Sequence, residues 1–190
     1  MLSRRALILA FLATSVAQAQ SQAKASEHPS VSFMKTVGKD LLNAHRQGTV
    51  AAFMRAVQRH GDIPAISDYS LGEYETKLPS GQKQKYYRGV ATFIARYFAD
   101  QSREFRVAKY EIGDASVAGE NDIVVSSKVF LLSGQTYTVN WRIAWKGGRY
   151  RVVDAKMLGF SLTYLQRNLF TSFLAKRNGD VAQLVAALNR

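Results

Sequence analysis

Four consecutive stretches in the second half of the chain alternate apolar and polar residues, and this pattern limits the possible folds more than any other feature. The stretches cover residues 104–112, 122–132, 135–145 and 149–158. The segments that separate them are Gly119-Glu120-Asn121, Ser133-Gly134 and Gly147-Gly148. A period of two is typical of strands with one buried face, and short turns of this composition join antiparallel neighbours. We therefore expect a four-stranded antiparallel meander.

The hairpin between the third and fourth stretches predicts a specific register. Large apolar residues occupy every second position of the third stretch: Tyr137, Val139, Trp141, Ile143 and Trp145. A two-residue turn at Gly147-Gly148 places Trp145 opposite Tyr150. The same register places Ile143 opposite Val152 and Trp141 opposite Asp154. A β-bulge would shift this pairing.

Helical periodicity occupies the first half of the chain and its end. Helices are expected to begin near residues 31, 50, 62, 70 and 82 and, after the strands, near residues 161 and 180. Ser70 and Glu73 fit a capping box, so a short helix is expected to run from Ser70 to about Pro79. The helix over 82–101 has an apolar face wider than a surface helix needs. Helices that precede and follow the strands along the chain indicate an α+β domain. We expect these helices to cover one face of a curved sheet.

The N-terminus has the three parts of a secretory signal peptide. Arg4 and Arg5 precede an apolar run over residues 6–17, and Ala17-Gln18-Ala19 forms a small-x-small cleavage site. The run is too short for a membrane-spanning anchor. We expect a signal peptide over residues 1–19 cleaved near Ala19, a flexible leader over 20–30 and one domain over 31–190. Export would place the mature protein in the periplasm.

Composition narrows the function further. The chain has no cysteine, which excludes thiol catalysis and cysteine-based metal sites. Its net charge of +12 favours anionic partners such as lipid headgroups or acidic protein surfaces, although it also fits a simply solvated basic face. Nucleic acid is not expected as a partner in an exported protein.

Residues that could carry catalysis are few. The chain has no HExxH motif, nucleophile elbow, P-loop or dinucleotide fingerprint, so neither a metal nor a cofactor is expected. Asp154 would share a strand face with apolar residues, where a raised pKa could make it an acid or base. Alternatively, Asp154 bonds to an arginine or to amides at the start of the helix after Ser161. We favour this structural role because no second catalytic group is visible.

Several segments, in order, resemble the MlaC family of periplasmic phospholipid carriers, also called toluene-tolerance or auxiliary ABC-transport components. They are YSLGEYETKL (69–78), YYRGVATFIARYFADQ (86–101), YRVVDAKMLGFSL (150–162) and QRNLFTSFLAKRNGDVAQLVAAL (166–188). The resemblance covers nearly all of the chain after the signal peptide. One departure is Glu73-Tyr74, where the family often has Trp-Arg.

The resemblance implies an NTF2-like α+β fold with an apolar cavity for acyl chains and no enzymatic activity. It implies a carrier that shuttles phospholipid between an inner-membrane MCE-domain ABC transporter and an outer-membrane lipoprotein–porin complex, which maintains outer-membrane lipid asymmetry. Some members are associated with hopanoid-producing membranes, so the cargo could be another lipid. The rival interpretations are a small enzyme that uses Asp154 and a basic adaptor without cargo.

Under this resemblance, face and periodicity predict the residues that line the cavity. They are Phe93, Ile94, Tyr97 and Phe98 from the long helix, Val129, Leu131, Tyr137, Val139, Trp141 and Ile143 from the sheet, and Leu158, Phe160, Leu165 and Leu169 from the last third. The candidates for contacts with a headgroup or an acidic partner are Arg88, Arg96 and Arg167.

Overall fold

The structure is a computed structural model that describes residues 27–119 and 122–190. The expected signal peptide and most of the expected leader lie outside the described residues. In chain order the elements are α1 (Pro29–Gln47), α2 (Val50–His60), α3 (Ile63–Leu71), the short 3-10 helices η1 (Gly72–Lys77) and η2 (Ser80–Gln82), α4 (Lys83–Glu104), β1 (Val107–Gly119), β2 (Asp122–Leu131), β3 (Thr136–Lys146), β4 (Arg149–Met157), β5 (Phe160–Ser161), α5 (Leu162–Ala175) and α6 (Val181–Leu188). This order confirms the predicted α+β class.

The strands form one antiparallel sheet in the order β1-β2-β3-β4-β5. The first four are the predicted meander, and β5 adds a two-residue pairing at the end of β4, with Met157 opposite Phe160. Strand β1 extends beyond its predicted end because it continues through a register shift after Ile112. Gly113 lies at this irregularity, and a Cβ there would be 2.5 Å from the Ser126 Oγ. A glycine is therefore needed for the close approach of β1 and β2.

The β3–β4 hairpin confirms two of the three predicted residue pairs. Gly147 and Gly148 both have positive φ, and Trp145 pairs with Tyr150 and Ile143 with Val152. A bulge then leaves one extra residue on β4, between the partners of Arg142 and Ile143.

The predicted pairing of Trp141 with Asp154 is therefore wrong. Trp141 lies opposite Ala155, and Asp154 lies opposite Arg142.

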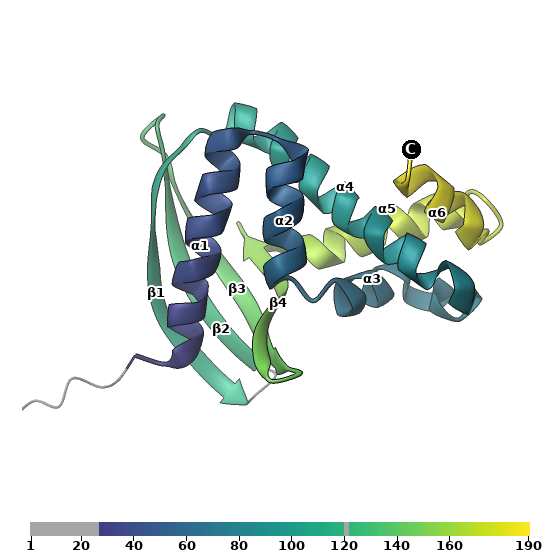
Figure 1. The fold of residues 1–190 in the computed structure, drawn as a ribbon, viewed down its shortest axis with the longest axis horizontal. Helices are drawn as coiled ribbons and strands as arrows, with labels where there is room; N and C mark the ends of the chain where they lie inside the picture. The colour runs from purple at the N-terminus through teal and green to yellow at the C-terminus, as the bar shows by residue number, and fades with distance from the viewer. Residues whose placement is uncertain (1–26, 120–121) are drawn as a thin grey trace, which may run out of the picture.

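Helices cover only one face of the sheet. In Figure 1, α1 lies along the sheet, α2 and α4 lie beside α1, and α3, α5 and α6 gather beyond the end of the sheet that carries β5. The other face is open and carries the exposed residues Lys128, Thr138, Asn140 and Arg142. Gly48 ends α1 in the left-handed conformation, and Thr49 caps α2 through its side chain.

The prediction of a helix that begins at Ser70 is wrong. Ser70 is inside α3, where its hydroxyl donates to the Ile66 carbonyl oxygen at 2.6 Å and accepts from the Gln166 side-chain amide at 2.7 Å. Since the hydroxyl is bonded in this way, it does not cap a new helix. The chain turns at Gly72, whose φ is 58°, and forms η1 instead.

Three separate apolar clusters hold the fold together. The sheet cluster joins α1 to the sheet through Val31, Met34, Val37, Ile123, Val125 and Ile143. The crossing cluster joins α1, α2 and α4 through Ala44, Ala52, Phe53, Ala95 and Ala99. The distal cluster joins α3, α4, α5 and α6 through Leu71, Leu78, Tyr86, Val90, Phe170, Leu174, Val181, Leu184, Val185 and Leu188. Met34 of the sheet cluster and Phe53 of the crossing cluster also border the candidate site.

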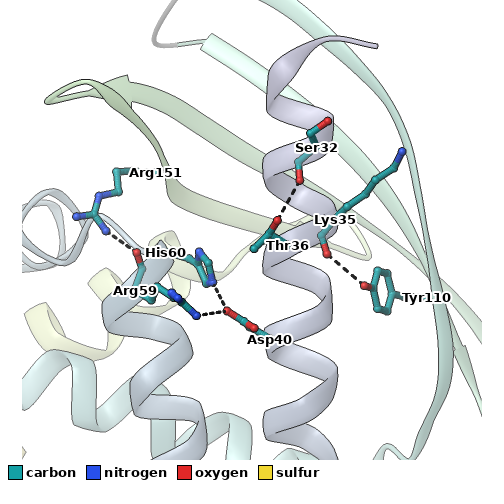
Figure 2. Close-up of polar contacts among 8 residues, drawn as sticks. All are labelled: Ser32, Lys35, Thr36, Asp40, Arg59, His60, Tyr110 and Arg151. Atoms are coloured by element: carbon teal, nitrogen blue, oxygen red, sulfur yellow. Dashed lines mark hydrogen bonds and ion pairs between the residues drawn. The ribbon is translucent and has the colours of Figure 1, made fainter.

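Polar contacts fix α2 to its neighbours on both sides (Figure 2). The Asp40 carboxylate on α1 contacts His60 Nε2 at 2.8 Å and Arg59 Nη1 at 3.2 Å. The Arg151 guanidinium on β4 donates to the Arg59 carbonyl oxygen at 2.8 Å. Just after α2, the Asp62 amide donates to the Val152 carbonyl oxygen at 2.9 Å. The end of α2 is thus attached to both α1 and the sheet.

Candidate functional site: an apolar cavity

A cavity of about 330 Å³ lies between the helices and the concave, helix-covered face of the sheet. Its walls come from α1, α2, α4, the first four strands and the start of α5. The lining residues are Met34, Gly38, Leu41, Leu42, His45, Phe53, Tyr97, Phe98, Gln101, Ser102, Phe105, Val107, Tyr110, Ile112, Ser127, Val129, Leu131, Tyr137, Val139, Trp141, Ala155, Met157, Leu158 and Leu162. None of these residues is an acid, a lysine or an arginine.

A second, smaller cavity of about 110 Å³ lies between α1, α2, α3, α4, α5 and the sheet, and His60 and Asp154 are among its lining residues. Ile66, Ile94 and Val152 are among its walls. Five residues border both cavities: Leu41, Phe98, Trp141, Ala155 and Leu162. The two spaces are therefore separated only by side chains, and Phe98 and Trp141 are the largest of them.

The sequence-predicted residues fall into three groups. Eight of them line the larger cavity: Tyr97, Phe98, Val129, Leu131, Tyr137, Val139, Trp141 and Leu158. Ile94 lines the smaller cavity. The remaining five residues line neither cavity.

Two of those five are packed inside the protein. Ile143 is fully buried in the sheet cluster, and Phe93 stacks edge-on against Phe170 in the distal cluster, with ring centroids 5.3 Å apart. The other three, Phe160, Leu165 and Leu169, are exposed. Leu165 and Leu169 face outward from α5, and Phe160 is in β5, just before that helix.

Sequence reasoning missed the contributions of α1 and β1. Leu41, Leu42 and His45 of α1 line the cavity, as do Tyr110 and Ile112 of β1. An apolar helical stripe has the same spacing whether it packs against a core or faces a hollow, so no sequence signal separated the two cases.

Gly38 allows α1 to lie close to β1 at the cavity wall. A Cβ at Gly38 would be 2.5 Å from the Tyr110 ring, so that ring packs directly on the α1 backbone. The Tyr110 hydroxyl then donates to the Lys35 carbonyl oxygen at 3.3 Å (Figure 2). This contact fixes the wall that α1 and β1 share.

The polar groups that line the larger cavity are uncharged. His45 Nε2 accepts a hydrogen bond from the Val107 amide at 3.0 Å, and burial lowers the pKa of His45, so its ring is uncharged at neutral pH. The Trp141 indole donates to the Ser127 hydroxyl at 2.8 Å. The cavity therefore presents no charge to a ligand inside it.

Asp154 has a structural role in this fold. Its Oδ1 accepts from the Ala155 amide at 2.8 Å and from the Thr163 amide, in the first turn of α5, at 3.1 Å. The predicted contact with amides at the start of this helix is thus confirmed, and it joins β4 to α5. Within residues 27–119 and 122–190, no group of three or more acidic or histidine side chains is placed to hold a metal ion.

The cavity opens to solvent between the end of α4 and the β4–β5 turn. Tyr97, Phe105 and Leu158 line the cavity and are exposed at the same time, so they mark its mouth. An uncharged hollow with an apolar mouth, set between a sheet and helices, defines a binding protein for an apolar ligand.

Comparisons with known proteins agree with this class. The family model described as MlaC protein matches residues 32–190, and the chain therefore belongs to the MlaC family. A solved phospholipid-binding protein from Ralstonia solanacearum, determined in complex with a phospholipid, has a similar fold. Its TM-score is 0.67 at 20% sequence identity, and the match covers 83% of this chain and 95% of that one. No curated protein matches the chain.

The fold comparison agrees with the open antiparallel sheet and its helical cover. None of the helices over residues 27–119 and 122–190 is long and apolar enough to cross a membrane.

Proposed function

We propose that the protein is a non-catalytic carrier that shelters the acyl chains of a phospholipid in the apolar cavity. The observation that carries this proposal is the complete lack of charged residues among those lining the larger cavity. A substrate site for a polar molecule would need partners for its polar groups, and this hollow offers very few.

The energetics of hydrocarbon in water explain why such a hollow is useful. At about 0.8 kcal/mol per methylene, exposing two chains with about 30 methylenes would cost on the order of 25 kcal/mol. A lipid crosses water only if that surface is covered. The larger cavity, at about 330 Å³, lies near the lower end of the roughly 300–1,000 Å³ usual for ligand sites, and the smaller one, at about 110 Å³, lies below that range.

The lipid is proposed to enter tail first through the mouth. Its chains would lie against the sequence-predicted residues at the larger cavity, and a chain end could pass Phe98 and Trp141 into the smaller cavity beside Ile94. The headgroup would stay at the mouth, since a charged group inside an uncharged apolar hollow would be left without partners. Family membership and the phospholipid-bound neighbour support this cargo.

The site of action is proposed to be the periplasm, after removal of residues 1–19. The carrier would move phospholipid between an inner-membrane MCE-domain ABC transporter and an outer-membrane lipoprotein–porin complex, and so maintain the lipid asymmetry of the outer membrane. Membership of the MlaC family supports these partners. No enzymatic activity is proposed, because Asp154 Oδ1 accepts the amides of Ala155 and Thr163 and so joins β4 to α5.

Filling the neck between the cavities tests the proposal. Ala155 borders both spaces, so Ala155→Phe should place a ring where the chains would lie. Gently purified wild-type protein should carry phospholipid in near-stoichiometric amount by native mass spectrometry, and Ala155→Phe should carry several-fold less while remaining folded.

The matched control is Ala118→Phe at an exposed position at the far end of β1, which should load like the wild type. A wild-type protein without lipid, or an Ala155→Phe variant with a full load, would overturn the proposal.

A further inference from the structure

Five exposed apolar side chains surround the mouth of the cavity. We call them the rim: Tyr97, Phe105, Leu132, Leu158 and Phe160. Three of them also line the cavity, and the other two are attached directly to the same segments. Leu132 donates its amide to the Arg106 carbonyl oxygen at 2.8 Å, and Phe160 pairs with Met157.

Sheet topology explains why these residues lie together. In an antiparallel sheet, the start of β1, the end of β2, the start of β3 and the end of β4 share one end of the sheet. Phe105 lies just before β1, Leu132 follows the end of β2, and Leu158 follows the end of β4. Figure 1 shows the α4–β1 connection and the β2–β3 turn at this same end, at the top of the view.

The turn between β4 and β5 carries an unusual residue. Leu158 and Gly159 form a two-residue turn in which both φ angles are positive, 52° and 85°. Asparagine and glycine suit such a turn, whereas a leucine there is sterically strained. Leu158 is nevertheless 67% exposed and Phe160 is 62% exposed. The free protein thus bears a backbone strain and an exposed apolar surface at the same point, with no partner inside the fold to offset either.

The charge around the rim is positive. The segments that carry it, residues 96–109, 128–132 and 156–160, contain six basic and two acidic residues. Within them, Lys156 precedes the turn and Arg106 follows Phe105. An apolar surface bordered by basic residues matches the chemistry of a bilayer with anionic headgroups, into which apolar groups insert while basic groups stay at the surface.

We propose that the rim docks directly on an anionic bilayer, with Leu158 and Phe160 inserted among the lipids so that the cavity mouth opens into the membrane. This inference rests on the proposed carrier function, because a rim of this kind joins the apolar interior of the cavity to the apolar interior of the membrane. An acyl chain would then pass between the two without crossing water.

Vesicle binding by the full-length mature protein tests the proposal. The vesicles contain phosphatidylethanolamine and phosphatidylglycerol at 3:1, and a second set contains only phosphatidylcholine. The wild type should bind the anionic vesicles, and high salt should weaken binding. The double variant L158N/F160S should lose about tenfold or more in partition coefficient.

Variant choice keeps the result interpretable. Asparagine suits the left-handed turn better than leucine, so L158N should not lower the melting temperature and a loss of binding cannot be attributed to unfolding. The matched control is V117S, at a valine that is 49% exposed at the opposite end of β1, and it should bind like the wild type.

Two outcomes would overturn the proposal: wild-type protein that does not bind anionic vesicles, or L158N/F160S that binds as well as wild type. Binding that requires a reconstituted membrane protein would also overturn it and would assign the rim to a protein partner. Mass spectrometry of lipid in the same samples separates the two proposals. A lipid-loaded protein that ignores vesicles refutes the docking alone, whereas an empty protein refutes the carrier.

Discussion

Two buried leucines should differ sharply in their effect on stability when each is replaced by alanine. Leu71 is 0% exposed and packed on all sides in the distal cluster, whereas Leu131 is 8% exposed and borders the larger cavity. Leu71→Ala should cost about 3–5 kcal/mol, because the loss of transfer free energy is joined by the cost of a new cavity.

The cost of Leu131→Ala should be about 1 kcal/mol. The substitution removes groups worth about 0.8 kcal/mol per methylene when fully buried, but part of the Leu131 surface already faces empty space and no new cavity is created. At roughly 2–4 °C per kcal/mol for a domain of this size, the melting temperature should fall by about 10 °C for Leu71→Ala and about 3 °C for Leu131→Ala.

Calorimetry or thermal circular dichroism on delipidated protein measures both values. Reloading with phospholipid should enlarge the cost of Leu131→Ala, which then loses contacts with the ligand, and should leave the cost of Leu71→Ala unchanged. Equal costs in the delipidated protein would show that the sheet has collapsed onto the helices and that the hollow does not persist, which would refute the reasoning.

Two further substitutions test contacts around α1. The hydrogen bond from His60 holds the pKa of Asp40 below its usual value. The carboxylate therefore stabilises the fold above about pH 4, and this contribution is lost as the pH falls through the depressed pKa. Asp40→Asn should cost about 1 kcal/mol at pH 7 and should flatten the acid side of a pH–stability profile measured by urea unfolding. A profile unchanged from wild type would contradict this role. Gly38→Ala should destabilise the fold by about 1–3 kcal/mol, because the new methyl group meets the Tyr110 ring. The control is Gly81→Ala, whose methyl group meets no atom within 4 Å and should not destabilise the fold. If Gly38→Ala is instead stabilising, as helix propensity alone predicts, the Tyr110 ring moves aside at little cost.

Local sequence patterns predicted the meander, its turns and most helices, because each depends on residues close together in the chain. The bulge in β4 was not visible in this way. It depends on how β4 meets α5, where Asp154 bonds the Thr163 amide, and it moved Asp154 from the predicted partner Trp141 to Arg142. One extra residue was enough to change the cross-strand partner of Asp154, while its favoured structural role was confirmed.

The candidate site was predicted in part for a related reason. A strand face that includes Val139 and Trp141 must meet the helical layer, so those residues were found at the cavity. Periodicity gives the direction of a side chain but not the distance to the opposite wall. Ile143 has the same alternation as Val139, yet α1 approaches it closely and fills the space.

Most residues of the three apolar clusters line neither cavity. The apolar contacts that stabilise the fold therefore lie mainly outside the cavity walls. If a ligand leaves the cavity, these packed contacts remain, so the empty protein should keep its fold.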